Sequence, residues 1–278
     1  MSGAIDPGQT ITVQNGTSLT ATGHIYANDT IMLGTFPAGG GQGATLDLQG
    51  HATVGTVQTQ FFTTDTIDVS GHAHIGNLTE GAQTSLLTVD LEAGSSLNAT
   101  INAGGYTDEL VVNGAAHSHL VNDSDSVVNV ASIGADVIGH GSWSFLAHPP
   151  GGGFLEFGGA VSHGQTVDLG FNSTLHIDDP NAFKGIVNAG SVWSDSYGNI
   201  LLGGVQADSW SYRNDMLTLY DNGKAVDRLR IEEASGAAPF SVGQGGGGIV
   251  ISGQLGQIGT TLLPEVNHGH VMVGGNIS

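Results

Sequence analysis

A strand-sized motif recurs through residues 46–140 and limits the possible folds more than any other feature of the chain. In each copy a triplet, usually apolar-polar-apolar, leads into a glycine, as Leu46-Asp47-Leu48 leads into Gly50. The following glycines, spaced 21, 23, 20 and 20 residues apart, are Gly71, Gly94, Gly114 and Gly134. The positions seven residues after the first four glycines are all apolar: Val57, Leu78, Ile101 and Val121. A fixed repeat near 20 residues is typical of a stacked array.

The alternation inside each copy has period two and contains no helical pattern, so the repeat predicts strands. One coil of about 20 residues buries few apolar side chains, but coils stacked roughly 4.8 Å apart join their cores and satisfy their backbones. We therefore predict an all-β fold, a β-solenoid. A β-sandwich or jelly roll, whose short strands also alternate with turns, is the alternative.

The regular spacing loosens after His140. The last triplet of the series is Val128-Asn129-Val130 before Gly134, and a Pro/Gly run over residues 148–153 is the best internal boundary. We therefore predict N-terminal coils over residues 1–148 and looser C-terminal coils over 154–278, continuous with the first. Early strands are expected at Thr10–Val13 and Thr30–Leu33.

Charge and composition exclude several classes of partner. The formal net charge is −20, and no Lys or Arg precedes Lys184. Such a chain disfavours nucleic acid and anionic membrane surfaces and attracts cations. It has no cysteine, which rules out disulfides and thiolate metal sites. Residues 1–7 are unlike a cleaved signal peptide, and no window is long and apolar enough for a membrane span. We expect an extracellular or cell-surface bacterial protein, exported without a cleaved N-terminal signal.

The second half resembles a known kind of sequence. The residues that carry the resemblance are Leu155-Glu156-Phe157-Gly158-Gly159-Ala160, Gly164-Gln165-Thr166-Val167, Leu175 to Gly185 with its Asp178-Asp179-Pro180 run, and Met216-Leu217-Thr218-Leu219. Over residues 154–253 the chain is similar to repetitive secreted and surface proteins of alphaproteobacteria that are autotransporter-like or hemolysin-like. The resemblance implies an extracellular, right-handed β-helix with an adhesive or matrix role and no catalytic residues. The chain lacks the Gly-Gly-x-Gly-x-Asp calcium repeats of hemolysin-type proteins.

Three aspartates occupy the same place in consecutive repeats. Asp47, Asp68 and Asp90 each lie between two apolar residues, so alternation predicts that their carboxylates face outward and stack one coil apart. Like charges at that distance repel by about 1 kcal/mol per pair in bulk water. Ca²⁺ bound between coils or subunits would relieve the repulsion. A solvated, screened face is the alternative.

Histidines are also numerous, with twelve in the chain. His51 and His72 follow equivalent glycines, and strand-like pairs occur at His72/His74, His117/His119 and His268/His270. Such a pair can hold Zn²⁺ or Cu²⁺ only with a third ligand, and none is obvious nearby. Protonation of histidines between pH 7 and 5 would offset much of the negative charge, so association is expected to rise as the pH falls.

The motifs of common hydrolases, phosphate-binding loops and zinc proteases do not occur in the sequence. A β-helical polysaccharide lyase needs a basic residue on a coil face, whereas the basic residues here begin at Lys184. Asp178 and Asp179 are adjacent, which suits a turn better than a glycosidase pair. We therefore expect no enzyme activity.

The ends of a solenoid offer unpaired strands to other copies of the same chain. We predict head-to-tail assembly into filaments or a surface or biofilm matrix layer, through Thr10, Ile11, Thr12 and Val13 at one end and His270, Val271, Met272 and Val273 at the other. The alternative is a glycan-binding adhesin or polysaccharide-active enzyme, with Trp193, Trp210 and Tyr212 as the aromatic candidates for a groove.

Overall fold

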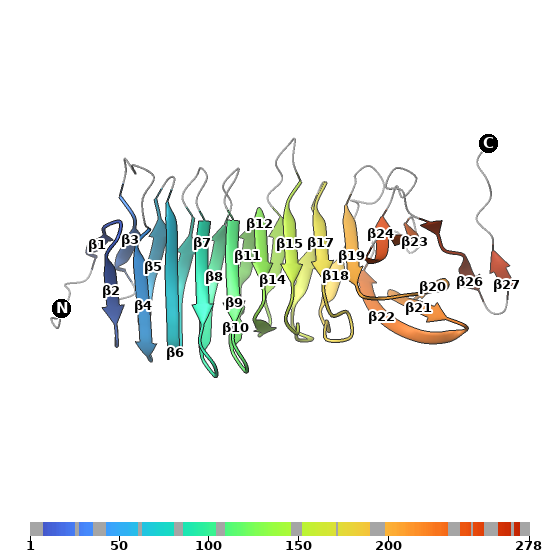
Figure 1. The fold of residues 1–278 in the computed structure, drawn as a ribbon, viewed down its shortest axis with the longest axis horizontal. Coiled ribbons are helices and arrows are strands. Elements are labelled where there is room, and N and C mark those ends of the chain that lie inside the picture. Colours follow the sequence, from blue (N-terminus) through green and yellow to red (C-terminus); the bar gives the residue numbers. More distant parts are fainter. Residues whose placement is uncertain are drawn as a thin grey trace.

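The computed structural model describes residues 8–25, 28–35, 43–60, 63–80, 86–103, 109–145, 152–170, 172–189, 198–232, 240–245, 247–252, 261–267 and 270–272. Over these residues the chain forms 27 strands and no helix. The strands stand side by side along an elongated body, with the first strands at one end and the last at the other (Figure 1). The described residues contain no helix that could span a membrane.

The strands alternate between two faces, which we name face A and face B. Face A contains β1 (Thr10–Val13), β3 (Thr30–Leu33), β5 (Thr53–Thr59), the second half of β6 (Thr64–Thr79), β8 (Ser96–Ala103), β10 (His119–Val121), β11 (Asp125–Val128), β13 (Asp136–Ile138), β14 (Ser142–Phe145), β16 (Thr166–Asp168), β18 (Ile186–Asn188) and β22 (Lys224–Glu232). Face B contains β2 (Ser18–Ala21), β4 (Thr45–Gly50), the first half of β6, β7 (Leu86–Leu91), β9 (Glu109–Gly114), β12 (Val130–Ile133), β15 (Phe154–Phe157), β17 (Thr174–Ile177) and β19 (Asn199–Gly203).

Strands one coil apart pair in parallel on both faces. On face B, Leu46 pairs with Ile67 and Ile67 with Val89, and on face A Ile31 pairs with Val57. This register confirms the predicted β-solenoid, because the alternative sandwich is built from antiparallel neighbours. The expected strands Thr10–Val13 and Thr30–Leu33 are β1 and β3. Parallel pairing also continues across the predicted boundary, since β12 pairs with β15.

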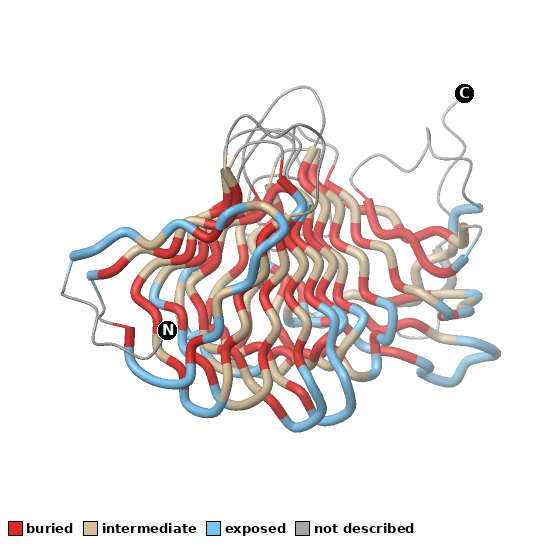
Figure 2. Tube along the Cα trace, turned by 60° about the vertical axis from the view of Figure 1, so that its left-hand side comes forward, coloured by how far each residue is buried: buried red, intermediate tan, exposed pale blue. Residues whose placement is uncertain are grey.

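The core lies between the two faces and runs the length of the coils. Buried and half-buried positions alternate along the strands (Figure 2). Leu46, Ile67, Val89 and Val112 form one inward column on face B, and each is at most 1 % exposed. Each fully buried side chain of this size contributes about 1.5–3 kcal/mol, so the apolar column ties each coil to the next.

Two details of the predicted repeat are wrong. Val121 pairs with Asn98 and is half-buried, whereas the residue beside Ile101 is Ser126. The triplet paired with Leu110-Val111-Val112 is Ala131-Ser132-Ile133, and Val128 belongs to face A. The first error arises because the residue equivalent to Gly94 is His117 and not Gly114: Ser96 pairs with His119, and Gly94 and His117 both have positive φ. The corner between β10 and β11 then adds residues before Ser126, so a constant offset from the glycine no longer finds the equivalent position.

That corner is held by a polar network inside the solenoid. Gln165 and Asn122 are both 0 % exposed. The Gln165 side-chain amide donates to the Asn122 carbonyl at 2.8 Å, and the Trp143 indole N–H donates to Gln165 Oε1 at 2.9 Å. Because the buried amides have partners, the network stabilises a coil that would otherwise enclose unpaired polar groups.

The C-terminal region differs from the predicted coils. On face B, β19 pairs antiparallel with β24 (Gly248–Ser252), which is followed by β23 (Ser241–Gly245) and β25 (Thr261–Leu262). On face A, β22 pairs antiparallel with β21 (Met216–Asp221), which is followed by β20 (Ser209–Arg213), β26 (Glu265–Asn267) and β27 (His270–Met272).

Two tight hairpin turns explain this change of direction. Asn214 and Asp215 connect β20 to β21, Asn222 and Gly223 connect β21 to β22, and all four have positive φ. Two-residue turns of this type join antiparallel strands because their twist matches that of a hairpin. The chain therefore folds back on itself instead of completing another coil.

Candidate functional site

The three predicted aspartates form a single outward column on face B. Asp47 pairs with Asp68 and Asp68 with Asp90, in agreement with the repeat. The outer two have polar partners: Gln49 Nε2 donates to Asp47 at 2.6 Å, and Asn113 Nδ2 donates to Asp90 at 2.7 Å. Asp68 therefore lies between two carboxylates.

Burial raises the pKa of Asp68 above its usual value, and the negative charges of Asp90, Asp47 and Glu92 add to that effect. The carboxylates are arranged in a line, one per coil, so neighbours can share an ion but all three do not converge on one point. Cation binding at this column stays a prediction.

Farther along face B, sequence reasoning missed a second polar group. Glu156 on β15 pairs with His176 on β17, and Asp178 follows two residues later. In the part of the chain that the structure describes, these three form the one group of metal-ligating side chains whose ligand atoms all lie within 4.8 Å. The 20-residue spacing between Glu156 and His176, equal to one coil, is the signal that could have revealed their contact.

The predicted turn at Asp178-Asp179-Pro180 is confirmed. The Asn181 N–H donates to the Asp179 side chain at 3.1 Å, and the Phe183 N–H donates to the Pro180 carbonyl at 3.2 Å. The turn carries the chain from β17 to β18 and leaves the Asp178 carboxylate on the side of His176.

His72 and His74 are exposed on face A, and His51 is exposed at the corner between β4 and β5. The rings of His51 and His72 have centroids 5.5 Å apart, and His72 Nδ1 lies 2.8 Å from Ser96 Oγ. His74 pairs with Thr53 and Asn98. The pair His72/His74 gains no third metal ligand among the described residues. His268 lies outside the described residues.

The N-terminal end is the first candidate contact surface. Within the described residues, β1 pairs with β3 alone and β2 with β4 alone. The inward residues Ile11 and Leu19 are half-buried, although Ile31 and Leu46 one coil farther on are 0 % exposed. The end of the core is thus partly uncovered.

The hydrogen bonds of β1 show which backbone groups are available. The carbonyls of Gln9 and Val13 each accept a bond from the β3 side at 3.0 Å. Because successive residues of a strand direct their backbone groups to opposite edges, Thr10 and Thr12 direct theirs to the other edge. The terminal coil therefore presents both apolar side chains and backbone donors and acceptors.

At the C-terminal end, β27 pairs with β26 and β25 with β23, and no other described strand pairs with either. Leu262 on β25 is 58 % exposed, the most exposed of the large apolar side chains in the described part of the chain. The predicted contact residues His270, Val271 and Met272 form β27. Val273 lies outside the described residues.

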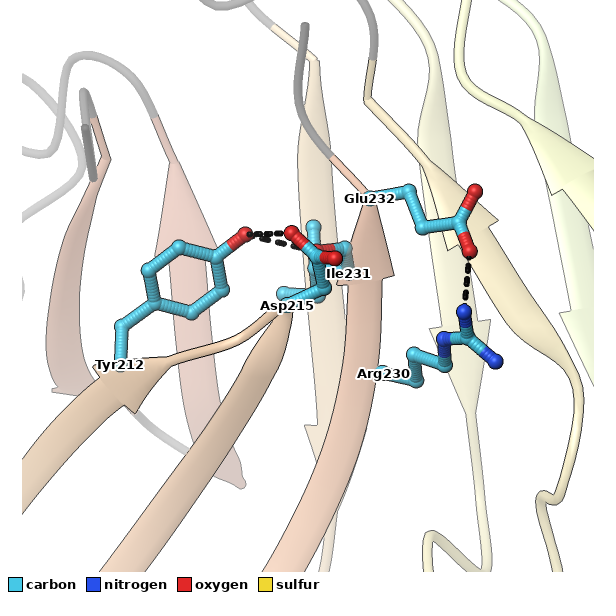
Figure 3. Close-up of polar contacts among 5 residues, drawn as sticks. All are labelled: Tyr212, Asp215, Arg230, Ile231 and Glu232. Carbon is cyan, nitrogen blue, oxygen red and sulfur yellow. Dashed lines mark hydrogen bonds and ion pairs between the residues drawn. The ribbon is translucent and has the colours of Figure 1, made fainter. Parts of the chain in front are cut away.

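The aromatic candidates for a glycan groove do not lie in one. Trp210 is 5 % exposed and donates its indole N–H to the Leu263 carbonyl at 3.0 Å. Tyr212 packs edge-on against Phe240 and donates its hydroxyl to the Ile231 carbonyl at 2.7 Å. The close-up of this region shows the Tyr212 ring directed at β22 (Figure 3). The glycan-groove alternative therefore gains no exposed ring from Trp210, which is buried, or from Tyr212, which is half-buried against the core. Trp193 lies outside the described residues.

A basic hollow lies near these strands on face A. It has a volume of about 380 Å³ and its lining includes Lys184, Arg228, Arg230 and His163. Three of the five basic residues of the chain thus gather at one place. Arg230 also pairs with Glu232 at 2.6 Å (Figure 3).

Comparison with protein-family models, with curated proteins and with solved structures finds no match to this chain. The resemblance of residues 154–253 to secreted alphaproteobacterial repeats thus stays a prediction.

Proposed function

We propose that this protein is an extracellular bacterial structural protein that assembles head-to-tail into filaments or a surface or biofilm matrix layer. The single observation that carries the proposal is the partly uncovered first coil, where β1 and β2 keep one edge without a described partner. The proposed role is mechanical and includes no catalytic step.

The arrangement of the faces supports a head-to-tail contact. β1 and β27 both belong to face A, and β2 and β25 both belong to face B. A second copy placed against the first coil would bring β27 beside β1 and β25 beside β2. Both sheets would then continue from one copy into the next, and Leu262 would be covered near Ile11 and Leu19.

The test is to block the edge of β1 without disturbing its bonds to β3. Thr12→Pro removes an N–H that points away from β3, so the fold should persist while fibres seen by electron microscopy disappear. The matched control, Thr12→Val, keeps the N–H and should assemble like the wild type. Leu262→Lys tests the other end and should also prevent fibres. Monodisperse wild-type protein, or fibres that persist in both blocked variants, would contradict the proposal.

Charge should control this assembly. The chain carries a formal charge of −20 with twelve histidines, so copies repel one another at neutral pH, and protonation of the histidines reduces that repulsion. Light scattering is expected to rise as the pH falls from 7 to 5. If Ca²⁺ bridges neighbours of the Asp47–Asp68–Asp90 column, it should raise the unfolding midpoint of the wild type and have less effect on Asp68→Asn.

A second candidate function is favoured by the basic hollow. An anionic glycan could place a carboxylate between Lys184 and Arg228, on a protein whose surface otherwise repels anions. Binding of a polyuronate, compared with a neutral polysaccharide, tests this role. Arg228→Ala should weaken binding, whereas the control Lys224→Ala removes an exposed cation outside the hollow and should not.

A further inference from the structure

We propose that Glu156, His176 and Asp178 form a binding site for Zn²⁺ or a chemically similar transition-metal ion on the outward side of face B. Two coils supply the side chains. Parallel pairing sets Glu156 beside His176, and the period of two puts Asp178 on the same side of the sheet as His176. This inference concerns a bound ion and does not depend on assembly.

The two short contacts of His176 use different ring nitrogens, and a single ion would bind only one of them. His176 Nε2 lies 3.3 Å from Asp178 Oδ1, and His176 Nδ1 lies 3.9 Å from Glu156 Oε1. One ligand atom from each residue lies within 4.8 Å of the others. Tetrahedral ligands at about 2.0–2.2 Å from Zn²⁺ lie roughly 3.3–3.6 Å from one another. The side chains are 29–44 % exposed, so they have room to turn and place one imidazole nitrogen and one oxygen of each carboxylate around a single ion.

The ligand set selects the kind of ion. An imidazole nitrogen with two carboxylate oxygens suits Zn²⁺, Ni²⁺ or Cu²⁺, whereas Ca²⁺ and Mg²⁺ prefer oxygen ligands alone. The aspartate column at the other end of face B offers oxygen only. The two ends of one sheet therefore differ in the cation that they suit.

A hollow beside His176 and Asp178 is the second observation. Its volume is about 460 Å³, and its lining includes His176, Asp178, Leu201, Gly203 and Gly248. A Cβ atom at Gly158 would lie 3.5 Å from Asp178 Oδ2, and one at Gly203 would lie 3.1 Å from the Asp178 carbonyl oxygen. Because these neighbours lack side chains, the space around the Asp178 carboxylate stays open.

That open space has a chemical consequence. Three protein ligands leave one position of a tetrahedral Zn²⁺ ion free, and the hollow gives a water molecule or a small anionic ligand room to occupy it. Structural zinc sites use four protein ligands, so this site would belong to the open class.

A protonated His176 held between two carboxylates is the competing explanation of the same distances. It requires no metal, and it predicts that removal of His176 leaves metal binding unchanged. Zinc titration therefore separates the two explanations.

The experiment is calorimetric titration of Zn²⁺ into the untagged chain of residues 1–278, with His176→Ala and Glu156→Gln as variants. His74→Ala is the matched control, because His74 is also an outward strand histidine but pairs with Thr53 and Asn98. We expect His176→Ala to lose one equivalent of Zn²⁺ or at least roughly tenfold in affinity, and Glu156→Gln to weaken binding. His74→Ala should retain that equivalent.

Co²⁺ provides a direct spectroscopic readout. The wild type should show the visible absorption of Co²⁺ with nitrogen and oxygen ligands in a low-coordinate site, and His176→Ala should lose it while keeping the wild-type circular dichroism. Equal Zn²⁺ stoichiometry and affinity in wild type and His176→Ala would overturn the proposal.

Discussion

Two polar groups on the same outward side of face B place their charges in different ways. Asp47, Asp68 and Asp90 repeat one residue type at one position of consecutive coils. The group of Glu156, His176 and Asp178 uses two neighbouring positions of two coils and mixes an imidazole with carboxylates. The first group is a line of like charges, whereas the second is a triangle.

This difference shows what a repeat can and cannot build. Stacking repeats a side chain along one direction only, so identical coils produce lines of ligands. A convergent site needs coils that differ from one another. It arises here in the looser half, close to where β19 meets the antiparallel β24. Regular coils thus supply the scaffold, and departures from regularity supply the site.

The largest effect on stability is expected when the charge of Asp68, at the centre of the aspartate column, is reversed. Asp68→Lys replaces two repulsive neighbours with two attractive ones, which should stabilise the protein by about 2 kcal/mol at low salt after screening is considered. Urea unfolding measures the change. The gain should largely vanish at high salt, and the control Glu109→Lys, outside the column, should shift stability by less than about 0.5 kcal/mol. An equal gain in both variants would show that net charge, not the column, is responsible.

A second histidine beside Glu156, His176 and Asp178 should raise the affinity of this group for Zn²⁺. Leu201 is half-buried, pairs with His176 and lines the hollow, so Leu201→His adds a nitrogen ligand one coil farther on. Zn²⁺ affinity should rise roughly tenfold, or by about 1.4 kcal/mol. Calorimetric titration measures it, with Leu201→Ala as the control that should show no gain. An unchanged affinity in Leu201→His would place the metal elsewhere.

The pH dependence of stability at Asp68 tests the repulsion within the aspartate column, with a smaller expected effect. Its pKa is raised in the folded protein, so its contribution to stability is most favourable when it is protonated and is lost as the pH rises through the folded pKa. Asp68→Asn should therefore be more stable than the wild type at pH 7, by about 1 kcal/mol at low salt. Thermal unfolding across pH should show the two midpoints converging as the pH falls below the usual aspartate range. A constant difference would refute the electrostatic explanation.

The smallest effect on stability is expected when His176 is replaced in the metal-free protein. His176 is 29 % exposed, so His176→Gln should change the unfolding free energy by less than about 0.5 kcal/mol in the presence of a chelator. Added Zn²⁺ should raise the unfolding midpoint of the wild type, because a ligand bound only to the folded state stabilises it, and should raise that of His176→Gln less. A large loss in chelator would instead mean that His176 is mainly structural.

Prediction from the sequence succeeded where the coils are most alike. The repeat identified β1, β3 and the register of Asp47, Asp68 and Asp90, because identical steps along the chain become identical steps in space. It misplaced Val121, because His117 and not Gly114 takes the place of Gly94 in that coil. A change of turn residue of this kind shifts the equivalent position without changing the alternation of apolar residues.

The hairpin region was missed for a different reason. Strands were expected there, but alternation alone does not tell parallel from antiparallel neighbours. The Asn222-Gly223 turn was a local signal for a hairpin, and the structure shows β21 and β22 on either side of it. Trp210 and Tyr212 were named as groove candidates from residue type alone, because nothing in their own segment shows that Phe240 packs against them.

The strand content, the stacked coils and the line of aspartates follow from the amino-acid sequence alone, because short-range alternation and a fixed repeat encode them. The contact among Glu156, His176 and Asp178 follows instead from the way the coils pack. Their contact depends on the register between β15 and β17 and on neighbouring glycines that leave the space open. A convergent group of side chains is a property of distances across coils, and those distances are fixed only when the coils pack.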